Sequence, residues 1–173
     1  KMLDAERVTL FLNDENTNEL WSQVAQGLGS MTIRLPNTAG IAGAVFTSAQ
    51  TINIKHAYAD LRFNPSFDRS TGYFTRSILC VPIINKNGKV IGVTQALNKK
   101  NGFFSEEDES RLKAFTSQIS AALENAALFA DVENMKNYNE GVLQSITNAV
   151  LTVSEKGIIT KCNAAGQIGR AHV

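Results

Sequence analysis

The stretch Asn98-Lys99-Lys100-Asn101-Gly102-Phe103-Phe104-Ser105-Glu106-Glu107-Asp108-Glu109 decides the fold. The apolar residues before it, 89–97, predict a β-strand, and a serine followed by four acids predicts the first turn of a helix. Lys99 at the strand end can therefore reach Asp108 in the helix, while Phe104 fills the space beneath them. Because no nucleophile or metal ligand accompanies this pair, the stretch indicates a structural joint rather than a catalytic site.

Working outward from this joint, apolar runs separated by polar turns predict a mainly antiparallel sheet. The strongest local prediction is a hairpin whose two strands, 76–84 and 89–97, are joined by a turn with Asn87-Gly88. A helix is predicted to start at Gly40, and residues 55–74 to form a partly helical loop that covers one face of the sheet. The remaining predicted strands are 8–12, 20–25, 31–35 and 50–54.

The helix after Ser105 is predicted to run past Val132 toward Lys136. Apolar residues recur along it at spacings of three and four: Leu112, Phe115, Ile119, Ala122, Ala126 and Phe129. A helix of this length exceeds what the domain needs for its own core, so its second half is expected to be an interdomain or dimer helix, and we favour a homodimer interface. The alternative is ordinary packing of the stripe on the parent sheet.

The composition describes an ordinary globular chain of 173 residues, 43% apolar, with a net charge of +1. Near-neutral charge argues against a nucleic-acid partner. No run approaches the roughly 18 apolar residues of a membrane span, and the start does not read as a signal peptide. Cys80 and Cys162 are far apart and predict no disulfide, and His56 has no second histidine nearby to form a metal site. We therefore expect a cytoplasmic protein without a metal or a membrane partner.

The spacing of Asn98, Lys99, Phe104, Asp108 and Glu109 resembles the NKFDE signature of cyclic-nucleotide-binding GAF domains, which occur in phosphodiesterases and cyanobacterial adenylyl cyclases. Other segments, in unbroken order from about residue 4 to 135, resemble the same family: Glu6 to Leu12, Gly40 to Gly43, Ala57 to Asp60, Arg62-Phe63, Ser70 to Gly72, Thr75-Arg76 and Ile78 to Ile83. The resemblance implies an α+β sandwich, the GAF fold: a central antiparallel sheet, helices on its faces and a long C-terminal connecting helix.

The domain organisation follows from the same comparison of patterns. We expect the sheet and ligand pocket in residues 1–104 and the C-terminal, connecting and dimerisation helix in 105–137. Residues 138–168, from Gly141 through a hairpin with Lys156-Gly157, resemble the truncated start of a PAS domain. Residues 169–173 depart from that pattern and are interpreted as a possible remnant of cloning, so His172 carries no functional weight.

The resemblance also implies a ligand site. The phosphate of a cyclic nucleotide would lie at the helix start, at Ile41 and Ala42, where free backbone N–H groups favour an anion. Thr71 and Thr75, spaced by four, are expected on one helical face, in contact with ribose and phosphate. Read without the resemblance, glycines at a helix start are also plain turn residues, and threonines also cap helices.

Purine-edge contacts are implied for Arg7 and Thr9, which share one strand face because strand side chains alternate. Polar groups on an apolar face are costly without a partner, which favours a binding role. Gln95 stands where cGMP-binding relatives often carry Glu, and its neutral amide removes a charge suited to guanine. Since Arg7 with Thr9 resembles the cyclase pattern, we expect cAMP rather than cGMP as ligand, with no other cofactor.

These expectations describe a non-catalytic sensor domain. Closure of the covering loop over cyclic nucleotide would shift the long helix and signal to downstream PAS and catalytic domains in cis. The catalytic domain is expected to be an adenylyl cyclase. One alternative is a GAF dimerisation module with a vestigial pocket. Another is a small-molecule reductase on the same fold, which would require redox cysteines in the covering loop; that loop has none.

Overall fold

The computed structural model describes residues 3–25 and 32–165, with the side chains of 23–25 left aside. Met31, predicted to begin a strand, and the suggested remnant at 169–173 lie outside these residues. The chain divides into two compact units, Lys1–Glu124 and Asn125–Val173. Within the described ranges, no helix combines the length and apolar character needed to cross a membrane.

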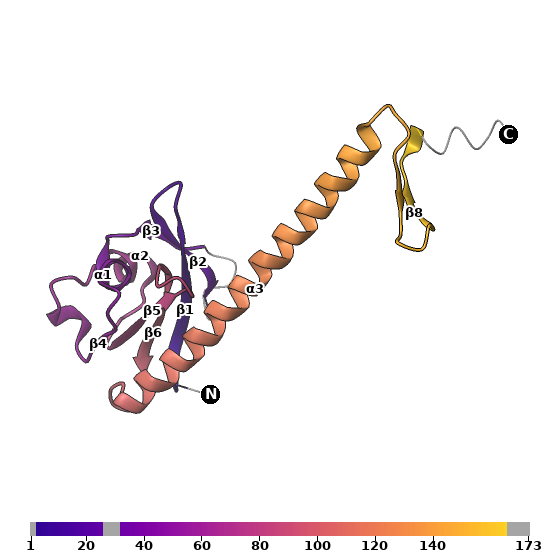
Figure 1. The fold of residues 1–173 in the computed structure, drawn as a ribbon. Coiled ribbons are helices and arrows are strands. Elements are labelled where there is room, and N and C mark those ends of the chain that lie inside the picture. Colours follow the sequence, from indigo (N-terminus) through magenta and orange to yellow (C-terminus); the bar gives the residue numbers. More distant parts are fainter. Residues whose placement is uncertain (1–2, 26–31, 166–173) are drawn as a thin grey trace. The chain divides into compact units, whose positions relative to one another are not determined.

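The first unit is built on a six-stranded antiparallel sheet in the order β3-β2-β1-β6-β5-β4 (Figure 1). The long central strands β1 and β6 pair along most of their length, with Thr9 opposite Gln95 and Arg7 opposite Leu97. The predicted antiparallel sheet and the hairpin of β5 and β6 are thereby confirmed. The strands are β1 (Ala5–Asp14), β2 (Glu19–Ala25), β3 (Arg34–Pro36), β4 (Ile52–Ile54), β5 (Ile78–Ile84) and β6 (Val90–Lys99).

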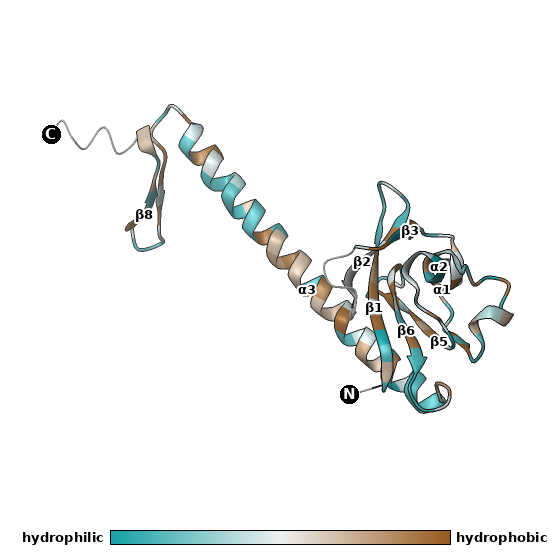
Figure 2. Cartoon of the chain, turned by 180° about the vertical axis from the view of Figure 1, so that it is seen from behind, coloured by the Kyte–Doolittle hydropathy of each residue, from teal (hydrophilic) through white to brown (hydrophobic). Residues whose placement is uncertain are grey.

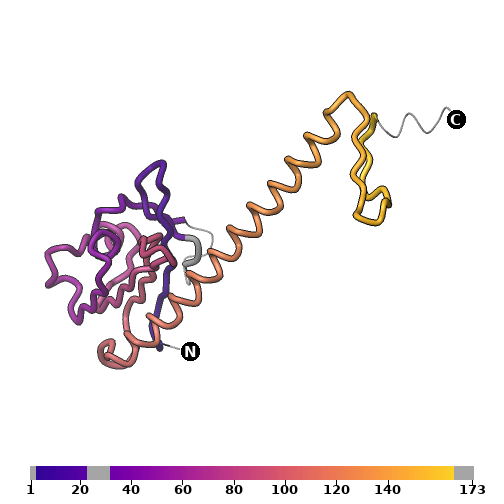
Figure 3. Tube along the Cα trace, in the orientation of Figure 1, coloured from indigo at the N-terminus to yellow at the C-terminus, as the bar shows by residue number. Residues whose placement is uncertain are grey.

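Helices lie on both faces of this sheet, and Figure 3 lets the connections between them be followed. One face packs against α1 (Gly40–Ser48), and the segment that covers this side contains a short 3-10 turn, η1 (Ala57–Ala59), and α2 (Ser66–Thr71). The other face packs against α3 (Glu106–Ser145), whose Leu112 joins a core with Leu79, Val81 and Ala96. The predicted α+β architecture is confirmed.

Strand alternation sorts the side chains between these two layers. In β1, Phe11 belongs to the core on the α1 side, whereas Val8 packs against the core on the α3 side. The sheet is buried on both faces, and the strands accordingly carry long apolar stretches, brown in Figure 2. A close approach of two central strands requires Gly92, because a Cβ there would lie 2.1 Å from the carbonyl oxygen of Phe11.

The predicted joint between β6 and α3 is present. The Lys99 ammonium lies 2.7 Å from Asp108 Oδ1 and also donates to the Leu3 carbonyl, while Phe104 is buried in the core cluster that includes Leu3 and Leu112. Ser105 and Asp108 cap the helix reciprocally, each backbone N–H donating to the other's side chain. Glu109 does not join this pair; its carboxylate accepts a hydrogen bond from Lys113 one turn later.

The same contacts fix the ionisation of Asp108. Burial alone would raise the pKa of its carboxyl group, but the hydrogen bonds from Lys99 and Ser105 together outweigh that effect. The pKa therefore lies below its ordinary value. A carboxyl group with a depressed pKa in the folded state stabilises the protein above its unfolded pKa, near 4, and this stabilisation is lost as the pH falls through the folded pKa.

Helix α3 differs from its prediction in two respects. It continues to Ser145 rather than ending near Lys136, so residues 141–145, expected to open a second domain, are helical. Its buried residues follow a spacing of four and include Leu112 together with Asp108, Thr116 and Ser120. Of the predicted apolar stripe only Leu112 is buried, and Phe129 is 77% exposed. Packing on the parent sheet is thus observed for Leu112, while the role of the rest of the stripe as a dimer interface stays a prediction.

The second unit contains the predicted hairpin, formed by β7 (Leu151–Val153) and β8 (Ile159–Cys162) with Gly157 at positive φ in the turn. The Asn163 amide donates to the carbonyls of Ile146 and Asn148 and thus links the hairpin to the end of α3. The hairpin exposes apolar side chains of both strands, among them Leu151 and Ile159.

Replacing Asp108 tests the joint. We expect Asp108→Ala to lower the free energy of unfolding by about 3 kcal/mol, because it removes the capping contact and leaves Lys99 without its carboxylate. Urea denaturation at pH 7 measures the effect. The control is Glu107→Ala, which removes an exposed pair with Arg111 and should cost under about 0.5 kcal/mol. Equal effects of both variants would show that the joint adds nothing to stability.

Candidate functional site

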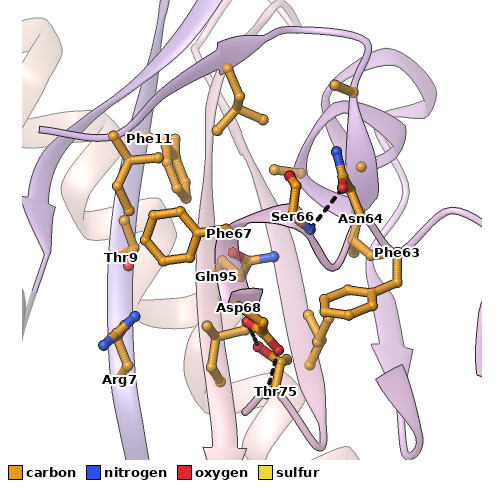
Figure 4. A pocket seen from close by; sticks show the side chains of 18 of the residues that line it. Arg7, Thr9, Phe11, Phe63, Asn64, Ser66, Phe67, Asp68, Thr75 and Gln95 are labelled. Atoms are coloured by element: carbon orange, nitrogen blue, oxygen red, sulfur yellow. Dashed lines mark hydrogen bonds between the residues drawn. The ribbon is translucent and has the colours of Figure 1, made fainter. Parts of the chain in front are cut away.

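The main cavity of the first unit, about 540 Å³, lies between the sheet, the start of α1 and α2. We call the segment that covers it, residues 55–75, the lid. Six of the seven predicted ligand-binding residues line this one cavity: Arg7, Thr9, Ile41, Ala42, Thr75 and Gln95. Figure 4 shows side chains of β1, β6 and the lid converging on it. The fold thus places at one cavity predicted residues that are up to 88 positions apart in the sequence.

Arg7 is the most informative side chain of the wall. It is only 9% exposed, and its guanidinium carbon lies 4.0 Å from the centre of the Tyr73 ring. Its Nη1 atom is buried and has no hydrogen-bond partner among the residues that the structure describes. An unpaired buried donor is costly, by about 1–3 kcal/mol, and a charged one more so. A group of this kind on a cavity wall is a specific indication that an acceptor binds there.

The α1 end of the cavity supplies backbone donors. Gly40 has φ +65°, and Ala39 before it provides no side-chain cap to the helix. No acidic side chain occupies the first turn, where Ile41 and Ala42 are both buried. The free N–H groups and the positive end of the helix dipole are therefore available to an anion.

Asp68 organises the lid and was missed by sequence reasoning. Its buried carboxylate accepts hydrogen bonds from the Thr75 backbone N–H (2.7 Å), the Thr75 hydroxyl (2.8 Å) and the Tyr58 hydroxyl (3.0 Å). These three donors satisfy both oxygens and tie α2 to the segment that leads into β5. The lid has weak periodicity, so nothing in its pattern distinguished this aspartate from a solvated one.

The aromatic lining was also missed. Phe63 and Phe67 of the lid and Phe11 of β1 line the cavity, and Figure 4 shows the Phe67 ring beside Thr9 and Gln95. Flat apolar rings suit the faces of a flat heterocycle. In Figure 4 the Phe11 and Phe67 rings lie on the same side of the cavity as Thr9 and Arg7, whereas Phe63 lies on the other side.

Thr71 departs from its prediction. Helix α2 ends at Thr71, followed by Gly72 in the left-handed conformation at φ +70°, so Thr71 and Thr75 do not share a helical face. The Thr71 side chain is exposed, and its hydroxyl donates to the Phe67 carbonyl (2.8 Å). It does not line the cavity. Thr75 does, although both its backbone N–H and its hydroxyl donate to Asp68.

The Cys80 side chain of β5 is fully buried, and burial raises the pKa of its thiol, which keeps it in the weakly nucleophilic thiol form. In the described part of the chain, no group of three His, Cys, Asp or Glu side chains is placed to hold a metal ion. At the cavity rim, Arg34 is half-exposed and pairs with Glu19 (3.1 Å) and Asp14 (3.7 Å), which leaves Arg7 as the wall's unpaired cation.

Comparisons with known proteins identify a family model and relatives that are similar to this chain. The family model described as GAF domain matches residues 1–123. The chain is 36% identical over 141 residues to the probable 3',5'-cyclic phosphodiesterase pde-5 of Caenorhabditis elegans, covering 75% of this chain and 19% of the relative. It is 34% identical over 160 residues to the dual 3',5'-cyclic-AMP and -GMP phosphodiesterase 11A of Takifugu rubripes, covering 85% and 18%.

Among solved structures, the GAF domain of a phosphoenolpyruvate-protein phosphotransferase from Coxiella burnetii shares the fold. Its TM-score is 0.65 at 22% identity, covering 73% of this chain and 76% of that one. A methyl-accepting chemotaxis protein gives a TM-score of 0.63 at 25% identity, covering 73% and 82%. This chain spans about a fifth of the length of the two phosphodiesterases.

The unpaired donor of Arg7 is expected to lower the stability of the nucleotide-free protein, although it favours binding of a ligand that carries an acceptor. We expect Arg7→Met to raise the free energy of unfolding of nucleotide-free protein by about 1 kcal/mol, because the cost of the unpaired donor exceeds the ring contact that is lost. Urea denaturation measures this, with Arg111→Met on the exposed face of α3 as the control for loss of a cation. A destabilisation of more than 1 kcal/mol would mean that Arg7 serves the fold itself.

Proposed function

The chain belongs to the GAF domain family, and from this premise we propose that it is a regulatory domain that binds a cyclic nucleotide in the cavity beneath the lid. The observation that carries the proposal is the buried, unpartnered Nη1 of Arg7 on the cavity wall. The cavity volume of about 540 Å³ lies within the range of about 300–1,000 Å³ common for small-molecule sites. Both relatives named above are enzymes whose names refer to cyclic nucleotides.

A cyclic nucleotide fits the distribution of groups in the cavity. The phosphate would take the backbone donors of Ile41 and Ala42, and the ribose would lie near Thr75. The purine would enter the aromatic end, between the rings of Phe11 and Phe67, with its edge toward Arg7, Thr9 and Gln95. This pose gives Arg7 the acceptor that it lacks, and it places the charge of the phosphate where no acidic side chain of α1 opposes it.

We further propose cAMP as the preferred ligand, because Gln95 presents a neutral amide to the purine edge. Arg7 carries only donors and could donate to acceptors of either purine, N1, N3 and N7 of adenine or O6, N3 and N7 of guanine, so it contributes affinity rather than base preference. Guanine adds donors at N1 and N2, which a carboxylate would satisfy best. Gln95, opposite Thr9 in the sheet register, offers one amide oxygen in place of a carboxylate. cGMP is the expected weaker ligand.

The route of the signal follows from β6. Gln95 and Leu97 of this strand line the cavity, while Lys99 at its end holds the first turn of α3 through Asp108. Movement of β6 on lid closure would therefore reach α3. We propose that this helix, as part of a homodimer, passes the change to a downstream PAS domain and an adenylyl cyclase. The ligand can shift the equilibrium only by its differential affinity for the open and closed lid.

Calorimetric titration tests the function directly, after mass spectrometry has shown that the purified chain retains no nucleotide. We expect tight cAMP binding that weakens at least about 100-fold in Arg7→Ala, because the variant loses a charge-assisted hydrogen bond to the ligand in a desolvated site. Arg111→Ala, which also removes one cation, should bind like the wild type. If the folded wild type binds neither cAMP nor cGMP, the chain is a GAF dimerisation module.

Gln95→Glu tests the base preference. The new carboxylate would accept hydrogen bonds from guanine N1–H and N2–H. It would also lack the amide donor that glutamine can offer to an adenine acceptor. We expect the ratio of cGMP to cAMP affinity to rise about tenfold or more, measured by the same titrations. Gln50→Glu, on the exposed approach to β4, is the charge-matched control. An unchanged ratio would remove Gln95 from the base-reading set.

A further inference from the structure

We infer that Tyr73 is a positioning residue for Arg7 and thereby a determinant of purine affinity. This inference rests on the proposed function. Tyr73 is absent from the cavity lining, so it acts on the ligand only through the guanidinium that lies over its ring.

The contact between the two side chains is close and shielded. Arg7 Cζ lies 4.0 Å from the ring centroid, and the Arg7 side chain is almost wholly removed from water. A guanidinium over an aromatic face is attracted by the ring quadrupole, more strongly when desolvated. A long arginine side chain otherwise loses considerable rotamer entropy when it binds a ligand. The contact with the ring orders the Arg7 side chain in the free protein, so less conformational entropy is lost when the purine binds.

The Tyr73 ring is itself fixed from two strands. Its hydroxyl donates to Glu6 Oε2 of β1 (3.2 Å) and accepts from Asn98 Nδ2 of β6 (3.0 Å). Burial, followed by the nearby Glu6 carboxylate, raises the pKa of Tyr73 to about 12. The phenol therefore stays protonated throughout the physiological range and keeps donating. Glu6 is held in turn by Arg76, 2.6 Å away.

The position of Tyr73 in the chain connects Arg7 to the lid. Tyr73 follows Gly72 directly after α2, and two residues later Thr75 is bonded to Asp68. A rearrangement of α2 would therefore move the ring that supports Arg7. The lid would thus influence the position of Arg7 through Tyr73, although Tyr73 itself does not contact the purine.

A double-mutant cycle on cAMP affinity tests the inference. We expect Tyr73→Leu to weaken binding about tenfold in the wild-type background and less than about twofold in the Arg7→Ala background. Tyr73→Phe, which keeps the ring, should stay within about threefold of wild type, and Tyr138→Leu on exposed α3 is the control. Equal losses in both backgrounds would overturn the inference.

A second readout does not depend on cyclic nucleotide. In the nucleotide-free protein, NMR of the arginine side chains should show hindered rotation of the Arg7 guanidinium in wild type and Tyr73→Phe. Free rotation is expected in Tyr73→Leu, or in Tyr73→Met should the leucine variant not fold. Unchanged rotation would overturn the positioning role. Failure of wild type to bind cAMP would instead refute the proposed function, while the NMR result would still decide this inference.

Discussion

The buried amide of Asn98 is the interaction on which the geometry of the site depends. Its Nδ2 donates to the Phe74 carbonyl (2.8 Å), the Glu6 carboxylate (2.9 Å) and the Tyr73 hydroxyl (3.0 Å). Its Oδ1 accepts from the backbone N–H groups of Arg76 (2.6 Å) and Ser77 (3.3 Å). One side chain thus satisfies the backbone of the segment that carries Thr75 and fixes the support of Arg7.

The backbone of Asn98 explains why this residue is an asparagine. It has φ +57°, a left-handed conformation that asparagine tolerates better than most residues with a side chain. Glycine would tolerate it too but would leave the five partners of the amide without a bonding atom. Aspartate could accept but could not donate to Glu6. Backbone conformation and hydrogen-bond demand together leave few alternatives.

The parts of the fold that were predictable from sequence are those with local causes. The joint of β6 and α3 follows from a strand end, a capping serine and a lysine within reach of the first helical turn. The wall formed by Arg7, Thr9 and Gln95 follows from alternation along two strands. The lid lacked such a rule: Asp68, Phe67 and Tyr73 acquire their roles only from contacts between segments. Gly72, a common helix terminator, was the available signal against a helical face shared by Thr71 and Thr75.

The α3 side of the sheet differs physically from the ligand side. Of the four buried residues in the described length of α3, only Leu112 is apolar. The hydroxyl of Thr116 on α3, and that of Thr94 on the strand face opposite Gln95, are buried without hydrogen-bond partners. The buried apolar core on this side ends on the helix at Leu112, and the buried residues of α3 beyond it are polar. The Ser120 hydroxyl donates to the Ile84 carbonyl (2.8 Å), and the Glu124 carboxylate accepts from the Lys86 backbone N–H (2.7 Å). Together with Lys99 and Asp108 at the first turn, these hydrogen bonds attach α3 to the hairpin of β5 and β6, so a displacement of that hairpin would act directly on the helix.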